Sequence, residues 1–359
     1  MPHSTHLFAN ALALIIVLQV PRAINASEDT TPSSKFESPS KYFHAQPISP
    51  GPWPTGQFGD LVVHSGEVFR LLAGQCYDYQ SITVESGGTL EIVPIQGAGW
   101  TIIGTTGDFV LKGTLVSHSN RYCDGTYMFT APDGQILNTV VARQHGGRGG
   151  NAYGRPPCNG GEASHKPNCG NGGGGASCGG PGLPGTARGG GNGGTSPSLH
   201  PTDEIGKGGM GGLWSSVDGQ DGGGTSGTSQ FTLHFGGGGG GGAAGADGGL
   251  VYLRVLGHFD ASGGIVDLAG QSGGSGGAGG GGQWCEPGGG GGGGSGGNGG
   301  YLFLRLANSF GQAKCLLGGG AGGHGGKAGR GNLNYADAYG QGGADGHDGT
   351  KGVFHLEQQ

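Results

Sequence analysis

Two arginines that follow aromatic residues at the same offset are the strongest candidates for chemistry in this chain. Arg254 stands two residues after Tyr252, and Arg305 stands two residues after Phe303. Residues two apart on a β-strand share one face of the sheet, so each pair would set a ring beside a guanidinium group. We favour a stacked arginine–aromatic ladder that stabilises a sheet. The alternative is a surface that binds an anionic or sugar ligand.

A second basic group has a three-residue spacing. His324, Lys327 and Arg330 follow Ala321 at that interval, with mostly glycine between them. A period of three is that of an extended helix of the polyproline II type. The three basic side chains would therefore form a short ridge along one edge of such a helix. A solvated edge is the favoured interpretation, and a ligand contact is the alternative.

Catalytic and metal-binding patterns do not stand out from the sequence. The 13 histidines never form an HxH or HExxH arrangement, which are spacings typical of metal ligands. Glycine-rich strings of the GxGxxG kind are expected by chance here, and none follows a strand and opens a helix as a dinucleotide site requires. We therefore predict no catalytic residue, no cofactor and no metal, and expect that the protein is not an enzyme.

A spacing of 51 residues indicates how these groups are positioned. Tyr252, Phe303 and Phe354 lie 51 residues apart, and Phe259 aligns with Phe310 at the same interval. The further alignments are Ile265–Val266 with Leu316–Leu317, and Ile102–Ile103, Phe109 and Leu115–Val116 with Tyr252–Leu253, Phe259 and Ile265–Val266. Internal repetition indicates stacked units. We predict units that start near residues 100, 250 and 301, with half a unit near the end of the chain.

The predicted fold class is all-β: a short β-solenoid or sandwich-like stack of strands, with glycine-rich loops forming polyglycine helices of the polyproline II type. Residues 60–145 form a β-rich domain of short strands broken by glycine turns. Residues 146–359 form a glycine-rich domain with β repeat units near 250–269 and 301–318. No segment after the N-terminal region has a convincing 3.6-residue apolar period, so few helices are expected.

The 94 glycines among 359 residues make the state of the glycine tracts the central structural question. Ordering one residue costs about 1–2 kcal/mol, and a lateral backbone hydrogen bond returns only about 0.5–1.5 kcal/mol. Ser272, Ser275 and Ala278 repeat every third residue, which favours ordered helices, and disorder is the alternative. Collagen is excluded because prolines are sparse and the Gly-X-Y register slips.

The N-terminal region predicts secretion. Residues 1–26 read as a signal peptide cut near Ala26, and residues 27–59 as a linker rich in proline and serine. The mature chain is expected to be soluble and extracellular, without stable membrane insertion. The net charge of −6 is evenly spread, so no nucleic-acid partner is expected. The disulfide candidates are Cys76, Cys123, Cys158, Cys169, Cys178, Cys285 and Cys315.

One segment carries a resemblance to known proteins. Residues 257–264 (GHFDASGG) follow an apolar run from Leu250 to Leu256 and precede GGSGGA repeats. This texture resembles secreted glycine-rich repeat surface proteins and, more loosely, the phage tail-tip adhesins whose polyglycine helices pack together and whose loop tips bind receptors. The likeness covers roughly residues 60–359, rests on composition and repeat texture, and carries over no binding residue.

The function expected from the sequence is that of a non-catalytic structural or adhesive protein of the cell surface or matrix. Its partners would be a cell surface, the extracellular matrix or a glycan, with a homo-oligomer also considered. Ice binding is the first alternative, since glycine-rich threefold helices occur in antifreeze proteins. A β-helical polysaccharide-active enzyme is the second alternative.

Overall fold

The computed structural model describes residues 53–95, 99–119, 125–141, 146–150, 237–281, 288–311, 313–330 and 340–358, together with a few positions between 160 and 220. All its regular elements are strands. The strands are β1 (Asp60–Val63), β2 (Val68–Leu72), β3 (Cys76–Tyr79), β4 (Ser81–Val84), β5 (Thr89–Val93), β6 (Thr101–Thr105), β7 (Phe109–Leu111), β8 (Thr114–Ser119), β9 (Gly125–Thr130), β10 (Ile136–Val141), β11 (Asp247–Gly248), β12 (Leu250–Asp260), β13 (Ile265–Asp267), β14 (Tyr301–Phe310), β15 (Lys314–Leu316) and β16 (Val353–Gln358).

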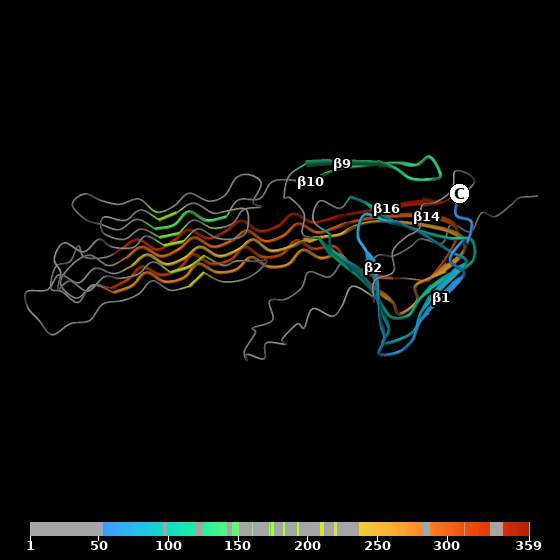
Figure 1. Ribbon diagram of the computed structural model, residues 1–359, viewed down its shortest axis with the longest axis horizontal. Coiled ribbons are helices and arrows are strands. Elements are labelled where there is room, and N and C mark those ends of the chain that lie inside the picture. The colour runs from blue at the N-terminus through green and yellow to red at the C-terminus, as the bar shows by residue number, and fades with distance from the viewer. Residues whose placement is uncertain are drawn as a thin grey trace, which may run out of the picture.

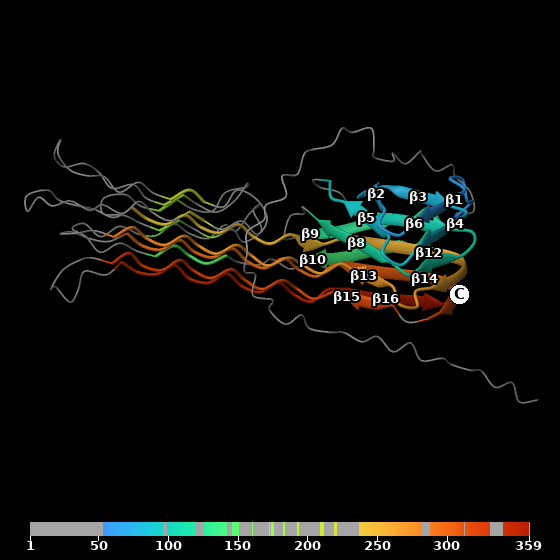
Figure 2. The same ribbon diagram turned by 90° about the horizontal axis from the view of Figure 1, so that it is seen from below.

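Two large sheets hold most of these strands (Figures 1 and 2). The eight-stranded sheet has the order β1-β4-β7-β12-β14-β16, and β3 and β6 extend it because β3 pairs with β6 and β6 with β12. The six-stranded sheet has the order β15-β13-β8-β5-β2, and the short β11 pairs with β8. Apart from β11, every pairing within these two sheets is parallel.

The predicted fold class is wrong, because the strands do not form a short stack of separate two-strand units. They form two large parallel sheets, a pattern best known from α/β proteins, although no helix is present among the described residues. Even spacing of short strands indicated local stacking. The alignment of Tyr252–Leu253 with Ile102–Ile103 gave the register of β12 with β6, 150 residues away in the sequence (Val251 with Thr101), but it did not indicate that the strands would join two continuous sheets.

The 51-residue spacing gives the pairing register of β12 with β14, in which Tyr252 lies opposite Phe303. The predicted alignments of Tyr252–Leu253 with Ile102–Ile103 and of Phe259 with Phe109 are also confirmed. The remaining predicted alignments are shifted. Phe303 lies opposite His355, one residue beyond Phe354. The other observed partners that differ from the predicted ones are Phe259 with Ser309, Val266 with Cys315 and Val266 with Leu115. A β-bulge between Val255 and His258 explains why Phe259 pairs with Ser309 and not with Phe310, because the bulge adds one residue to β12.

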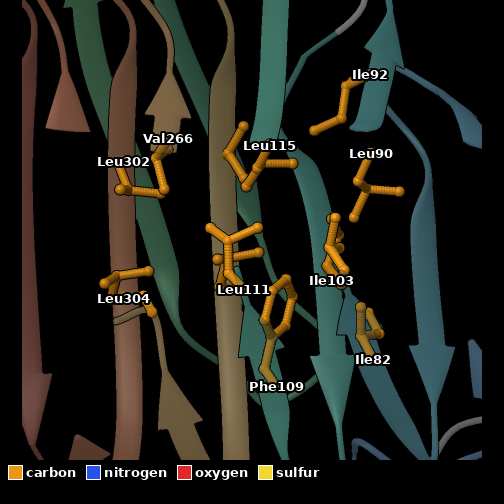
Figure 3. Packing of buried hydrophobic residues seen from close by; sticks show 14 of the residues in the cluster. Ile82, Leu90, Ile92, Ile103, Phe109, Leu111, Leu115, Val266, Leu302 and Leu304 are labelled. Atoms are coloured by element: carbon orange, nitrogen blue, oxygen red, sulfur yellow. The ribbon is translucent and has the colours of Figure 1, made fainter. Parts of the chain in front are cut away.

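A hydrophobic core fills the space between the two sheets. Residues of both sheets point into this space, as Figure 3 shows for Leu90 and Leu115 of the six-stranded sheet and Ile103 and Phe109 of the eight-stranded sheet. These four side chains are 0–1% exposed. Burial of one such side chain stabilises the fold by about 1.5–3 kcal/mol. This core holds the strands in a fixed register.

The glycine-rich segments run on from the strands as long extended chains that lie side by side (Figures 1 and 2). They bond laterally at every third residue. Bonds from residues 270–279 to residues 318–327 are Gly270 N to Gly318 O, Gly273 N to Ala321 O, Gly276 N to His324 O and Gly279 N to Lys327 O, each 2.7–2.9 Å long. This spacing is the one carried by Ser272, Ser275 and Ala278, and it is the period of a polyproline II helix.

Residues 288–300 lie inside this bundle and contact glycine-rich chains on several sides. A methyl group at Gly294 would overlap the carbonyl oxygen of Ala243, and one at Gly293 would overlap that of Gly323. Only glycine allows backbones to approach this closely. Side chains in this segment are therefore confined to one column, in which Ser295 and Asn298 are 1% and 2% exposed.

Candidate functional site

The predicted arginine–aromatic pairs lie on the outer face of the eight-stranded sheet, in two rows that cross its strands. The aromatic row consists of Tyr252, Phe303 and His355, which are register partners on β12, β14 and β16, and the aliphatic Ile102 of β6 lies beside Tyr252 in the same row. The charged row lies two residues further along the strands. It consists of Asp78, Arg254, Arg305 and Glu357, with Gly104 between Asp78 and Arg254. We call the two rows together the ladder face.

Ring contacts connect the aromatic row. Tyr252 and Phe303 meet edge to face with centroids 5.4 Å apart, and Phe303 and His355 lie 4.3 Å apart. Trp53 closes the other end, 6.3 Å from Tyr252. The indole of Trp53 fills the space above Gly104, where a methyl group would collide with it. Aromatic pairs of this geometry add about 0.5–1.5 kcal/mol beyond the area that they bury.

A single carboxylate, Asp133, binds the charged row from above. It lies in the turn between β9 and β10, and its side chain is 1% exposed. One oxygen, Oδ2, accepts hydrogen bonds from the hydroxyl of Tyr252 at 2.7 Å and from Arg305 Nη1 at 3.1 Å, and pairs with Arg254 Nη1 at 2.8 Å. Three donors on one buried oxygen make this carboxylate a structural cross-link between the hairpin and the sheet.

Burial and this network also fix the protonation state of Tyr252. Desolvation is the largest cause that raises the pKa of its phenol, and the bond to Asp133 raises the pKa further because it favours the neutral donor. The hydroxyl therefore stays protonated throughout the physiological range. It acts as a hydrogen-bond donor to the hairpin and not as a general base.

The β9–β10 hairpin covers only part of the ladder face (Figure 1). Ala131 and Leu137 of the hairpin are buried in one cluster with Trp100, Ile102 and Tyr252. On the side of β14 and β16 the face opens to solvent. Its open half is Phe303, Arg305, His355 and Glu357, in which His355 is exposed, Phe303 is half-buried and Arg305 Nη2 lies 3.7 Å from Glu357 Oε1.

The other predicted basic residues lie elsewhere, on the surface of the glycine bundle. His324, Lys327 and Arg330 are exposed and stand in one column with Ala321. The neighbouring segment supplies acidic groups: Asp345 Oδ1 lies 3.8 Å from His324 Nδ1 and accepts the amide hydrogen of Gly325 at 2.7 Å. The structure thus keeps the two predicted groups apart.

Two of the predicted disulfide residues are free thiols. Cys76 is half-buried and Cys315 is buried, and neither is paired. Burial raises the pKa of each thiol to about 11, so both stay protonated and unreactive at neutral pH. In the structure both cysteines pack against the hydrophobic clusters. The remaining five, Cys123, Cys158, Cys169, Cys178 and Cys285, lie outside the described residues.

Sequence reasoning missed three residues of the site: Asp133, His355 and Glu357. The signal for Asp133 was the turn sequence Pro132-Asp133-Gly134 between two β-rich runs, which is typical of a hairpin. A need for a counter-charge was a further signal, because arginines on a covered face are almost always paired.

Protein-family models, curated proteins and solved structures contain no match to this chain. The part of the chain that the structure describes contains no helix long and apolar enough to cross a membrane. The same residues include no group of three or more histidine, cysteine, aspartate or glutamate side chains suited to hold a metal ion.

Proposed function

We propose that this protein is a secreted, non-catalytic structural or adhesive protein of the cell surface or matrix. The observation that carries the proposal is the glycine bundle, whose chains are bonded at every third residue and whose interior admits almost no side chains. Such a bundle supports a role as a rigid spacer, because a flexible tether would need no lateral bonds. Its sites of recognition would then be the side chains that reach the surface.

The open half of the ladder face is the surface best suited to adhesion. It offers the neighbouring, tilted rings of Phe303 and His355 beside the guanidinium of Arg305 and the carboxylate of Glu357. Ring faces suit the apolar faces of sugars, and charged groups can bond their hydroxyls. We therefore propose a glycan of a cell surface or matrix as the partner.

The surface chemistry of the bundle favours this role over ice binding. An ice-binding face needs ranks of small side chains at threefold spacing, which Ser272, Ser275 and Ala278 supply. The column on the adjacent, hydrogen-bonded chain instead carries His324 and Lys327, both exposed. Charged, bulky side chains interrupt the flat face, so ice binding receives less support.

Binding of the labelled whole chain to intact cells and to a glycan panel tests the proposal. We expect binding to at least one surface, and loss of it when His355→Ala and Glu357→Gln are combined. The matched control is Lys327→Ala with Arg330→Ala on the bundle, which should bind like the wild type. Absence of binding to every cell and glycan would overturn the adhesive role, and loss with the control pair alone would overturn the choice of surface.

A further inference from the structure

The β9–β10 hairpin lies on the eight-stranded sheet without joining it. Its two strands pair only with each other among the described strands. Its contacts with the sheet include the buried Ala131 and Leu137, which belong to the cluster around Tyr252, and the carboxylate of Asp133 (Figure 1). A two-stranded hairpin is marginally stable by itself, so the position of this one depends on such side-chain contacts.

The two arginines beneath the hairpin share a single oxygen of that carboxylate. Oδ2 of Asp133 contacts Nη1 of Arg254 and Nη1 of Arg305, and it accepts the hydroxyl hydrogen of Tyr252. Oδ1 accepts the amide hydrogen of Gln135 within its own turn, at 3.1 Å. A carboxylate without a turn of its own can give both oxygens to an arginine fork. Such an anion would bond this pair of arginines more completely than Asp133 does.

The contact between hairpin and sheet also contains buried polar atoms that have no hydrogen-bond partner in the described part of the chain. They are Nε of Arg254, Nε1 of Trp53 and Oγ1 of Thr139. Arg254 belongs to the charged row, Trp53 lies beside Tyr252 at the end of the aromatic row, and Thr139 shares the buried face of β10 with Leu137. Buried polar groups are nearly always bonded, because an unmet donor has lost its bonds to water. All three atoms gain partners, from a ligand or from water, when the hairpin leaves.

We propose that the ladder face binds a glycan that carries a carboxylate, and that Asp133 occupies the place of this carboxylate while the hairpin is closed. The inference rests on the proposed function, since it names the class of glycan. The glycan carboxylate bonds Arg254 and Arg305, and its sugar ring lies on the row of Tyr252 and Phe303. Two residues along a strand span about 6.4–6.8 Å, so the ring and a substituent of one sugar reach both rows.

The open half of the ladder face gives the glycan its way in. Phe303 and Arg305 are half-buried there, whereas Tyr252 beneath the hairpin is buried. The sugar carboxylate reaches Nη1 of Arg305 first and then displaces Asp133, while Glu357, 3.7 Å from Nη2, accepts sugar hydroxyls. Asp133 competes from within the same chain, at an effective concentration on the order of millimolar. The closed hairpin therefore weakens the apparent affinity in proportion to the fraction of molecules in which it is open.

Binding of acidic sugars to the whole chain tests the ligand class. Uronic and sialic acids both supply such a carboxylate, so the two arms are oligogalacturonate and sialyllactose, each compared with its methyl ester. Asp133→Asn keeps the size of the side chain and removes its charge. This variant should bind at least one of the acids about tenfold more tightly than the wild type does, with no such gain for the ester.

Two further variants make the result specific. Adding Arg254→Gln to Asp133→Asn should abolish the gain. The double variant should also fold where the single one does not, because it removes a buried charge that has lost its partner. The matched control, Glu91→Gln on the six-stranded sheet, should bind like the wild type.

The outcomes separate this inference from the adhesive role. Equal affinity of the wild type and Asp133→Asn for both acids, an equal gain for the esters, or a gain that survives Arg254→Gln would each overturn the proposal. If the wild type still binds a neutral glycan, only the acidic ligand class fails. Absence of binding by every variant to every glycan would overturn both proposals.

Amide hydrogen exchange tests the displacement of Asp133 in the wild type, without any substitution. The amide of Ala131 donates to the carbonyl of Gln135 at 2.8 Å across the turn of the hairpin. Saturation with whichever acid binds should speed exchange at this amide about tenfold, because the released hairpin opens locally, while the amides of β12 keep their protection. Bound acid with unchanged exchange in the hairpin would overturn the proposal.

Discussion

Replacement of Gly294 by alanine tests whether the glycine bundle is packed as closely as a protein core. A Cβ at this position would overlap the carbonyl oxygen of Ala243, which accepts a hydrogen bond from Gly274 N. Gly294 N itself donates to Gly274 O at 2.9 Å, and Gly294 O accepts from Gly323 N at 2.7 Å. The colliding atoms belong to the backbone, so no side chain can rotate away to make room.

The magnitude follows from these contacts. Overpacking of a close-packed interior costs about 1–3 kcal/mol, and loss of two lateral hydrogen bonds adds about 0.5–1.5 kcal/mol each. Alanine returns about 0.4–1 kcal/mol by restricting the unfolded chain. We therefore expect Gly294→Ala to lower the free energy of unfolding by about 1–6 kcal/mol in chemical denaturation.

Gly342→Ala is the matched control. Gly342 is exposed, and a Cβ there would lie 3.3 Å from Gly326 O, a contact that a small shift relieves. This variant should be neutral or slightly stabilising. Equal effects of the two substitutions would refute close packing of the bundle and, with it, the explanation of why the interior segments are almost entirely glycine.

Two further predictions concern buried polar groups. Asp133→Asn should lower the free energy of unfolding by about 3 kcal/mol, because it leaves two arginines without their shared counter-charge. The control is Glu91→Gln, at the exposed pair with Arg70, which should change the free energy of unfolding by less than about 1 kcal/mol. Similar losses for the two variants in denaturant titrations would contradict the role of Asp133 as a cross-link. Cys76 and Cys315, whose pKa values are raised to about 11, should react with a thiol reagent at pH 8 far more slowly in the folded chain than in the denatured one. Because the unfolded thiol has the lower pKa, their contribution to stability is complete below pH 9 and declines as pH rises from about 9 to 11, and a flat stability profile over that window would argue against their burial.

Sequence periodicity predicted register well where segments of equal length separate two strands. Tyr252 and Phe303 are partners because no residue is added or lost between β12 and β14 at that point. One additional residue before β16 moved the partner of Phe303 from Phe354 to His355. A slip of one residue turns a side chain to the other face of the sheet, so Phe354 packs toward the core while His355 extends the ladder face. Periodicity alone does not detect such a slip.

The ladder face was predictable in part. The offset of Arg254 from Tyr252 placed ring and guanidinium on one face, as found. Asp133 was not predicted to join them, because it lies 119 residues from Tyr252 in a hairpin that pairs only with itself among the described strands. Parallel sheets likewise bring together segments far apart in the sequence. The repeat alignment gave the pairing of β12 with β6 and β7. It did not show that all these strands join two continuous sheets, and the fold class was missed for that reason.

Amide hydrogen exchange across residues 288–300 tests the central claim, an ordered glycine bundle that continues from two parallel sheets, most directly. Gly291, Gly294 and Gly297 each donate a backbone hydrogen bond inside the bundle, to Gly277, Gly274 and Gln271. The account predicts that their amides are protected to a degree similar to those of β12 and β14. Exchange at the rate of an unstructured peptide in this segment, with protection retained in the two strands, would contradict it.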